Sequence, residues 1–203
     1  PRFDPPEILE ADLSALTLDC ARWGVADPRT LAWIDSPPDA AVAEARARLT
    51  TLGAIDGDGR VTPHGDAIVR LPLAPRLAHM LIEAGKMGLG TTASQIAVLL
   101  GERGLGGPDV DLESRLRRWR SEKGARADHA RRMAVRWAAM VDERAANASV
   151  GADVATCIAL AFPDRIARRR DSTGESWASV GGRGFRLDPT NALARAEWLA
   201  VAE

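Results

Sequence analysis

The residues most able to do chemistry in this chain are its arginines, because a guanidinium group can form two parallel hydrogen bonds with one phosphate. Residues 115–136 hold nine bases against two acids, a balance of +7, and residues 168–170 form a second basic cluster. Both clusters predict contacts with nucleic-acid phosphates. A solvated helical face is the alternative interpretation. On charge alone, the candidate binding residues are Arg115, Arg118, Arg131, Arg132, Arg168, Arg169 and Arg170.

The opposite end of the chain is acidic. Residues 1–60 hold eleven acids against six arginines, a balance of −5, although the net charge of the whole chain is only −1. This polarity fits a molecule that docks on a neighbour with one end and faces phosphate with the other.

Aromatic rings are a second way to hold a nucleic acid, since bases stack on them. The six tryptophans are spread singly along the chain, a pattern more typical of core residues than of a stacking platform. Trp177 is retained as a binding candidate because it lies on a predicted barrel strand.

The spacing of the histidines and cysteines favours neither a metal site nor thiol chemistry. His64, His79 and His129 lie in three separate predicted elements with no i,i+4 pairing, so no metal site is predicted. Cys20 and Cys157 are far apart in the sequence, which suggests neither a disulfide framework nor a thiolate site.

Catalytic motifs are also missing from the sequence. It contains no G-x-x-x-x-G-K-[ST] phosphate loop, no Asp-Glu-Ala-His string and no G-x-S-x-G elbow. The glycine cluster at residues 101–107 lacks the Lys and Ser/Thr that would meet phosphate and metal, so it is interpreted as a flexible loop. The chain by itself is therefore predicted to have no ATPase activity.

Composition sets the outer limits. The chain has 203 residues, 46% of them hydrophobic and 27% charged, as in globular proteins with one or two domains. No apolar run approaches the roughly 20 residues of a membrane span, and no signal peptide is evident, so no membrane partner is expected. Because the two cysteines suggest no disulfide, we expect a reducing, cytoplasmic compartment. The first residue is Pro1 rather than Met, which suggests a piece of a longer protein.

Periodicity predicts a mainly α fold with small β parts. A small hairpin with a tight turn is expected at residues 54–61, and Thr62 with Pro63 should begin a helix. Asp39 is expected to cap the helix that follows Pro37 and Pro38. The longer predicted helices cover residues 7–23, 39–52, 75–86, 92–102, 111–121, 125–146 and 150–161.

The last forty residues change to a two-residue periodicity. A hairpin is predicted from about residue 176 to 188, around the glycines at 181–184, and residues 198–201 could add another strand. Two or three strands alone are marginal, so this segment is interpreted as the start of a truncated β-barrel.

Four linked motifs carry a family resemblance. They are Ile34–Pro38, Leu52–Asp56, Thr62–Gly65 and Leu71–Leu81, and in this order they resemble the helicase-associated region of DEAH-box (RNA helicase A type) ATPases. The strings FPDRIARRR and LDPTNALARAEWL resemble the bacterial HrpB-type branch of that family.

The resemblance implies three parts: a winged helix over residues 1–72, a ratchet-like helical bundle over 73–170, and the start of an OB-like β segment over 171–203. It further implies an accessory module of an ATP-dependent RNA helicase, which braces the motor domains and contacts single-stranded nucleic acid. The expected partners are single-stranded RNA or DNA and the parent's own motor domains. ATP and Mg²⁺ belong to those motor domains, and no cofactor is expected in this fragment. The alternative is a winged-helix protein-interaction or regulatory module that binds no nucleic acid.

Overall fold

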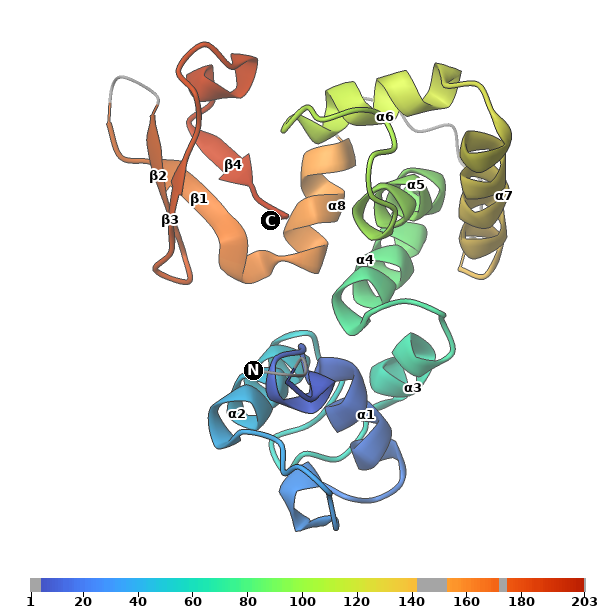
Figure 1. Ribbon diagram of the computed structural model, residues 1–203, viewed down its shortest axis with the longest axis vertical. Helices are drawn as coiled ribbons and strands as arrows, with labels where there is room; N and C mark the ends of the chain where they lie inside the picture. The colour runs from blue at the N-terminus through green and yellow to red at the C-terminus, as the bar shows by residue number, and fades with distance from the viewer. Residues whose placement is uncertain (1–4, 142–152, 172–174, 203) are drawn as a thin grey trace. The chain divides into compact units, whose positions relative to one another are not determined.

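The computed structural model describes residues 5–141, 153–171 and 175–202. The chain divides into two compact units, residues 1–79 and 80–203. Figure 1 labels the helices and strands of both units. The predicted class, mainly α with small β parts, is confirmed.

The first unit is built from short helices. They are η1 (Glu7–Leu9), α1 (Ser14–Arg22), η2 (Pro28–Thr30), α2 (Asp39–Thr51), α3 (Pro63–Val69) and the beginning of α4 (Pro75–Lys86). The prediction of one unbroken helix over residues 7–23 is wrong. The Asp12 carboxylate accepts hydrogen bonds from the backbone N–H and the hydroxyl of Ser14, and this local turn separates η1 from α1.

Helix α2 buries the face that the three- and four-residue spacing of its apolar residues predicts. Val42, Ala45 and Leu49 are buried, and Leu13 from the segment before α1 joins their cluster. Asp39 is not the N-cap, because Pro38 occupies that position; Asp39 is the first helical residue and pairs with Arg29. The Asp39 carboxylate therefore stabilises the helix N-terminus through its negative charge rather than through a capping hydrogen bond.

The turn after α2 follows the predicted chemistry. Gly53 has φ +68°, a conformation that side chains disfavour, and ends the helix. The expected hairpin is reduced to a single Ile55–Val61 bridge. The Thr62 side chain then accepts a hydrogen bond from the Gly65 N–H at 3.0 Å, which caps α3.

The second unit contains a helical part centred on α5 (Gly90–Gly101). The helices α6 (Leu112–Ser121), α7 (Ala125–Ala139) and α8 (Asp153–Ala161) pack against α5. Helix α7 ends at Ala139, and the predicted continuation includes residues 142–146, which lie outside the described residues. The spacing of Met133, Trp137 and Met140 predicts that they form the core face of this helix. That prediction is partly wrong, because Met140 is exposed and the buried residues are small: Ala127, Ala130, Ala134 and Ala138. No helix among the described residues could span a membrane.

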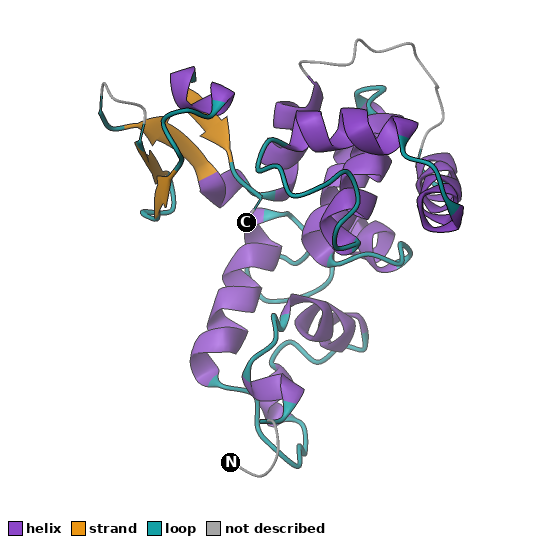
Figure 2. Ribbon diagram, turned by 45° about the horizontal axis from the view of Figure 1, so that its top comes forward, coloured by secondary structure: helices purple, strands orange, loops and turns teal. Residues whose placement is uncertain are grey.

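The sheet of the second unit has four antiparallel strands (Figure 2). They are β1 (Ile166–Arg169), β2 (Ser176–Ser179), β3 (Gly184–Arg186) and β4 (Trp198–Ala200), in the order β3-β2-β1-β4. The predicted hairpin and final strand are present, but β1 was not predicted and falls on the bundle side of the expected boundary at residues 170 and 171. Helix α8 leads through the 3-10 helix η3 (Pro163–Arg165) into β1 and packs beside β4.

Candidate nucleic-acid interface

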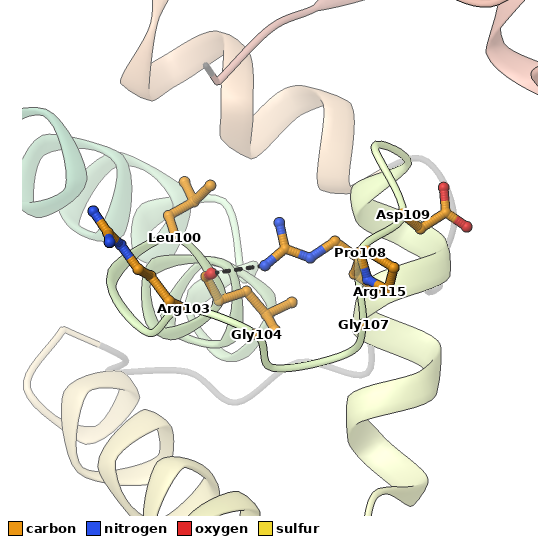
Figure 3. Close-up of a pocket in the computed structure, with 8 residues that line it drawn as sticks. Leu100, Arg103, Gly104, Gly107, Pro108, Asp109 and Arg115 are labelled. Carbon is orange, nitrogen blue, oxygen red and sulfur yellow. Dashed lines mark hydrogen bonds between the residues drawn. The ribbon is translucent and has the colours of Figure 1, made fainter.

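Helix α6 carries two candidate arginines one turn apart, and both have polar partners within the chain, although the Arg118 side chain is 52% exposed. Arg115 donates to the carbonyls of Leu99 (3.1 Å) and Leu105 (3.4 Å). Figure 3 marks a hydrogen bond of the Arg115 guanidinium with a dashed line. Arg118 forms an ion pair with Asp109. These two arginines hold the end of α5 and the loop before α6, so their charge is largely used within the fold.

The loop that they hold lines a cavity of about 410 Å³ (Figure 3). Gly106 has φ +69°, and a Cβ built on it would lie 2.3 Å from the Arg115 carbonyl oxygen, so only glycine fits there. The Gly106 N–H also donates to Glu122 at 3.1 Å. The glycine-rich segment at residues 101–107, expected to be a flexible loop, is thus held against α6 by backbone packing and a hydrogen bond. The residues around the cavity are Leu99, Leu100, Arg103, Gly104, Gly107, Pro108, Asp109 and Arg115.

The α7 candidates differ from each other. Arg131 donates to the Trp119 carbonyl at 2.9 Å and pairs with Asp128. Arg132 is exposed, and no described residue gives it a polar partner. Arg117 on α6 and Arg136 on α7 share this condition, although charge clustering alone did not single them out. Arg117, Arg132 and Arg136 are therefore accessible to a ligand, whereas Arg131 links α7 to α6.

The arginine run at β1 does not form a single patch, because side chains alternate between the two faces of a strand. Arg168 is exposed and donates to Glu197 at 3.1 Å. Arg169, on the opposite face, donates to the Arg195 carbonyl at 3.5 Å. Arg170 follows the strand and is exposed. The run therefore offers Arg168 and Arg170 to one side and Arg169 to the other.

The stacking role predicted for Trp177 is wrong. Its side chain is 0% exposed and forms a core cluster with Ala167 and Ala194, so no base can reach it. Trp198 is the exposed aromatic residue of this sheet, at 54%. It lies opposite Arg168 in the β1–β4 register, with the guanidinium carbon 5.4 Å from the ring centroid. Sequence reasoning missed it because the pairing of two strands about thirty residues apart is not a local signal.

The histidines also depart from expectation. His64 on α3 and His79 on α4 lie in separate elements, as predicted, yet their ring nitrogens Nε2 and Nδ1 are 2.8 Å apart. The spacing of the histidines along the chain therefore did not reveal that these two side chains meet. His129 on α7 is exposed.

Comparison with known proteins gives a consistent result. No family model matches the chain. ATP-dependent RNA helicase HrpB of Escherichia coli (strain K12) is 36% identical over 195 residues, which are 96% of this chain and 23% of that protein. Probable ATP-dependent RNA helicase DHX34 of Mus musculus is 36% identical over 98 residues, 48% of this chain and 9% of that protein.

Solved structures agree with the sequence matches. A crystal structure of the E. coli DExH-box NTPase HrpB matches with a TM-score of 0.78 at 33% identity, covering 98% of this chain and 23% of that one. The chain thus spans about a quarter of the length of HrpB. Sequence and fold together place this chain in the DEAH-box helicase family, in the C-terminal region of the HrpB type.

Proposed function

We propose that this chain is the accessory nucleic-acid-binding region of an ATP-dependent RNA helicase. Its second unit contacts single-stranded RNA, and its first unit, a winged-helix module, braces the motor domains. ATP and Mg²⁺ bind to those motor domains, because this sequence has no phosphate loop to hold them. The similarity to HrpB and DHX34, an ATP-dependent RNA helicase and a probable one, supports the RNA helicase part of this proposal.

The single observation that carries the RNA-binding role is the Arg168–Trp198 pair. The pair joins an exposed aromatic face to a neighbouring cation on adjacent strands. Single-stranded nucleic acids are held by this combination of base stacking and phosphate pairing, which tolerates any sequence. Glu197 partly neutralises Arg168, so binding depends on the ring as much as on the charge.

Exposed cations of the second unit extend this surface chemistry. Arg117, Arg132, Arg136 and Arg170 are exposed, and their side chains have no polar partner in the part of the chain that the structure describes. If three or four such cations neutralise phosphates together, log K should fall against log salt with a slope of roughly −2 to −3. Because phosphate contacts carry no sequence information, the affinity should depend little on base composition.

Fluorescence anisotropy of a labelled single-stranded RNA, titrated with the 203-residue chain at low salt, tests the proposal. Replacing Trp198 with alanine should weaken binding by about 5- to 150-fold, the range of 1–3 kcal/mol for one stacked base. Trp23→Ala is the matched control, because Trp23 is also exposed (82%) but lies in the first unit. Equal affinity of the Trp198→Ala chain and the unsubstituted chain would remove this ring from the site.

A second candidate function is protein interaction without nucleic acid. Trp23 and Ile34 are both highly exposed in the first unit, and Leu31 is partly exposed between them in sequence. Exposed apolar side chains of this size are typical of contacts with another protein. Calorimetric titration of the chain with the separately expressed motor domains tests this, and Ile34→Asp should weaken the heat of binding. RNA titration separates the two candidates, since the second predicts no RNA binding.

A further inference from the structure

The residues that line the cavity at the end of α5 all belong to the second unit. They come from the end of α5, the glycine-rich loop that follows it and the first turn of α6. The cavity volume of about 410 Å³ lies within the range of roughly 300–1,000 Å³ that small-molecule sites occupy. A phosphate ion alone would leave most of this space empty, whereas a molecule about as large as a mononucleotide would fill it.

The backbone around the cavity is held in place by hydrogen bonds. Glu122 accepts the Gly106 N–H, and the Asp109 side chain accepts the Asp111 N–H at 3.0 Å. Asp109 is the acidic residue among those that line the cavity, and its carboxylate is neutralised by an ion pair with Arg118. A site that is already ordered loses little conformational entropy when a ligand binds.

Two arginines line this cavity and keep unused hydrogen-bond donors. Both hydrogen bonds of Arg115 to carbonyls use Nη2, so no described residue accepts from Nη1. Figure 3 shows its side chain reaching from α6 toward Leu100 at the end of α5. The Arg103 side chain is exposed, and no described residue gives it a polar partner. The carboxylate of the adjacent Glu102 pairs with Arg126 instead, so it does not neutralise Arg103.

We propose that this cavity binds the 5′-phosphate and the base of a nucleotide. The guanidinium group of Arg103 forms two parallel hydrogen bonds with the phosphate, and Arg115 adds a hydrogen bond from Nη1. A phosphate monoester carries about two negative charges near neutral pH, which two arginines match. The apolar side chains of Leu100 and Pro108 provide a surface against which the flat base packs.

Two sources share this ligand chemistry: the phosphorylated 5′ end of an RNA strand and a free nucleoside monophosphate. The RNA end rests on the proposed function, because it requires RNA to bind to the second unit, whereas the free nucleotide does not. The site differs from a phosphate loop, since arginine side chains rather than a lysine and a Ser/Thr hydroxyl meet the phosphate.

Isothermal titration calorimetry of adenosine 5′-monophosphate (AMP) into the purified 203-residue chain tests the site. We expect one AMP per chain and no binding of adenosine, which lacks the phosphate. Arg103→Ala should weaken AMP binding by about tenfold or more, the loss expected for a hydrogen bond between charged groups. This variant should fold, because the Arg103 side chain is exposed. Arg117→Ala is the matched control, since Arg117 is exposed on α6 but does not line the cavity.

A 5′-phosphorylated RNA and a 5′-hydroxyl RNA of the same short sequence separate the two sources. Tighter binding of the phosphorylated strand that is lost in Arg103→Ala assigns the RNA end. Equal binding of the two strands together with AMP binding assigns the free nucleotide. Trp198→Ala should leave AMP binding unchanged, so failure of the proposed RNA site is distinguishable from failure of this one. The proposal is overturned if neither AMP nor the 5′-phosphate binds, or if Arg103→Ala and Arg117→Ala bind AMP equally.

Discussion

Arginines cluster both on the helices α6 and α7 and along strand β1, yet the two regions use them differently. On the helices, Arg115 and Arg131 donate to carbonyls of neighbouring segments and so fasten the fold. On β1, the pleat sends Arg168 to the exposed face, where it meets Trp198. A run of positive charge in the sequence thus gives the number of arginines that could contact phosphate. The hydrogen-bond acceptors around each arginine in the fold decide which of them remain available.

The same contrast separates the two tryptophans of the sheet. Trp177 lies on β2 and fills the core against Ala167, while Trp198 lies on β4 and is exposed. Both residues belong to short strands of one sheet, so the residue type does not distinguish them. Only the face on which each ring lies separates the buried tryptophan from the exposed one.

The largest expected effect is the difference in stability between the Trp177→Ala and Trp198→Ala variants. Trp177→Ala should lower the free energy of unfolding by about 3–5 kcal/mol, because it empties a fully buried aromatic site. Trp198→Ala should change it by only about 0.5 kcal/mol or less, as is usual for an exposed side chain. Urea denaturation followed by circular dichroism measures both. Similar losses in the two variants would break the distinction.

A smaller difference in stability is expected between variants of two arginines of α6. Arg115→Ala should destabilise the protein by about 1.5–3 kcal/mol, the usual range for a hydrogen bond made by a charged group. Arg117→Ala, two residues further along the same helix but exposed, should stay within about 0.5 kcal/mol. The same denaturation experiment compares them, and an unchanged midpoint for Arg115→Ala would show that its carbonyl contacts contribute nothing to stability.

The salt dependence of RNA binding extends the comparison to function. Removing one phosphate contact should flatten the slope of log K against log salt by about 0.7 on single strands. We expect this change for Arg168→Ala and again for Arg170→Ala. Arg131→Ala should leave the slope unaltered, provided that the variant is folded, because Arg131 is engaged by Asp128 and a carbonyl. Anisotropy titrations at several salt concentrations provide the measurement, and equal slopes for all three would contradict the assignment.

The smallest expected effect concerns an arginine of the first unit that is engaged by carboxylates. Hydrogen bonding from Arg29 lowers the pKa of Asp27 from 3.8 to about 2. Since the folded-state pKa lies below the unfolded value, this contribution to stability is present above about pH 4 and is lost as the pH falls through 2. Carboxyl-detected NMR titration measures the pKa, and Arg29→Ala should return it toward 3.8. A titration midpoint near 3.8 in the unsubstituted chain would contradict the pairing.

Local features of this protein follow from the sequence alone. Thr62 before Pro63 caps a helix because its hydroxyl can reach an N–H three residues on, and Gly53 ends one because only glycine accepts a positive φ easily. The spacing of Val42, Ala45 and Leu49 fixed the buried face of α2. The linked motifs around them also identified the family. Each of these signals lies within a few residues or in a fixed order along the chain.

The tertiary structure decided the features that depend on distant partners. Strand β1 was missed because its pairing joins residues 166–169 to segments that come later in the chain. The same pairing buried Trp177, exposed Trp198 and divided the arginine run between two faces. The packing of α3 near α4 brought His64 to His79 across fifteen residues. Residue type and spacing limit what each side chain can do, but contacts between distant segments determine which of those possibilities its surroundings allow.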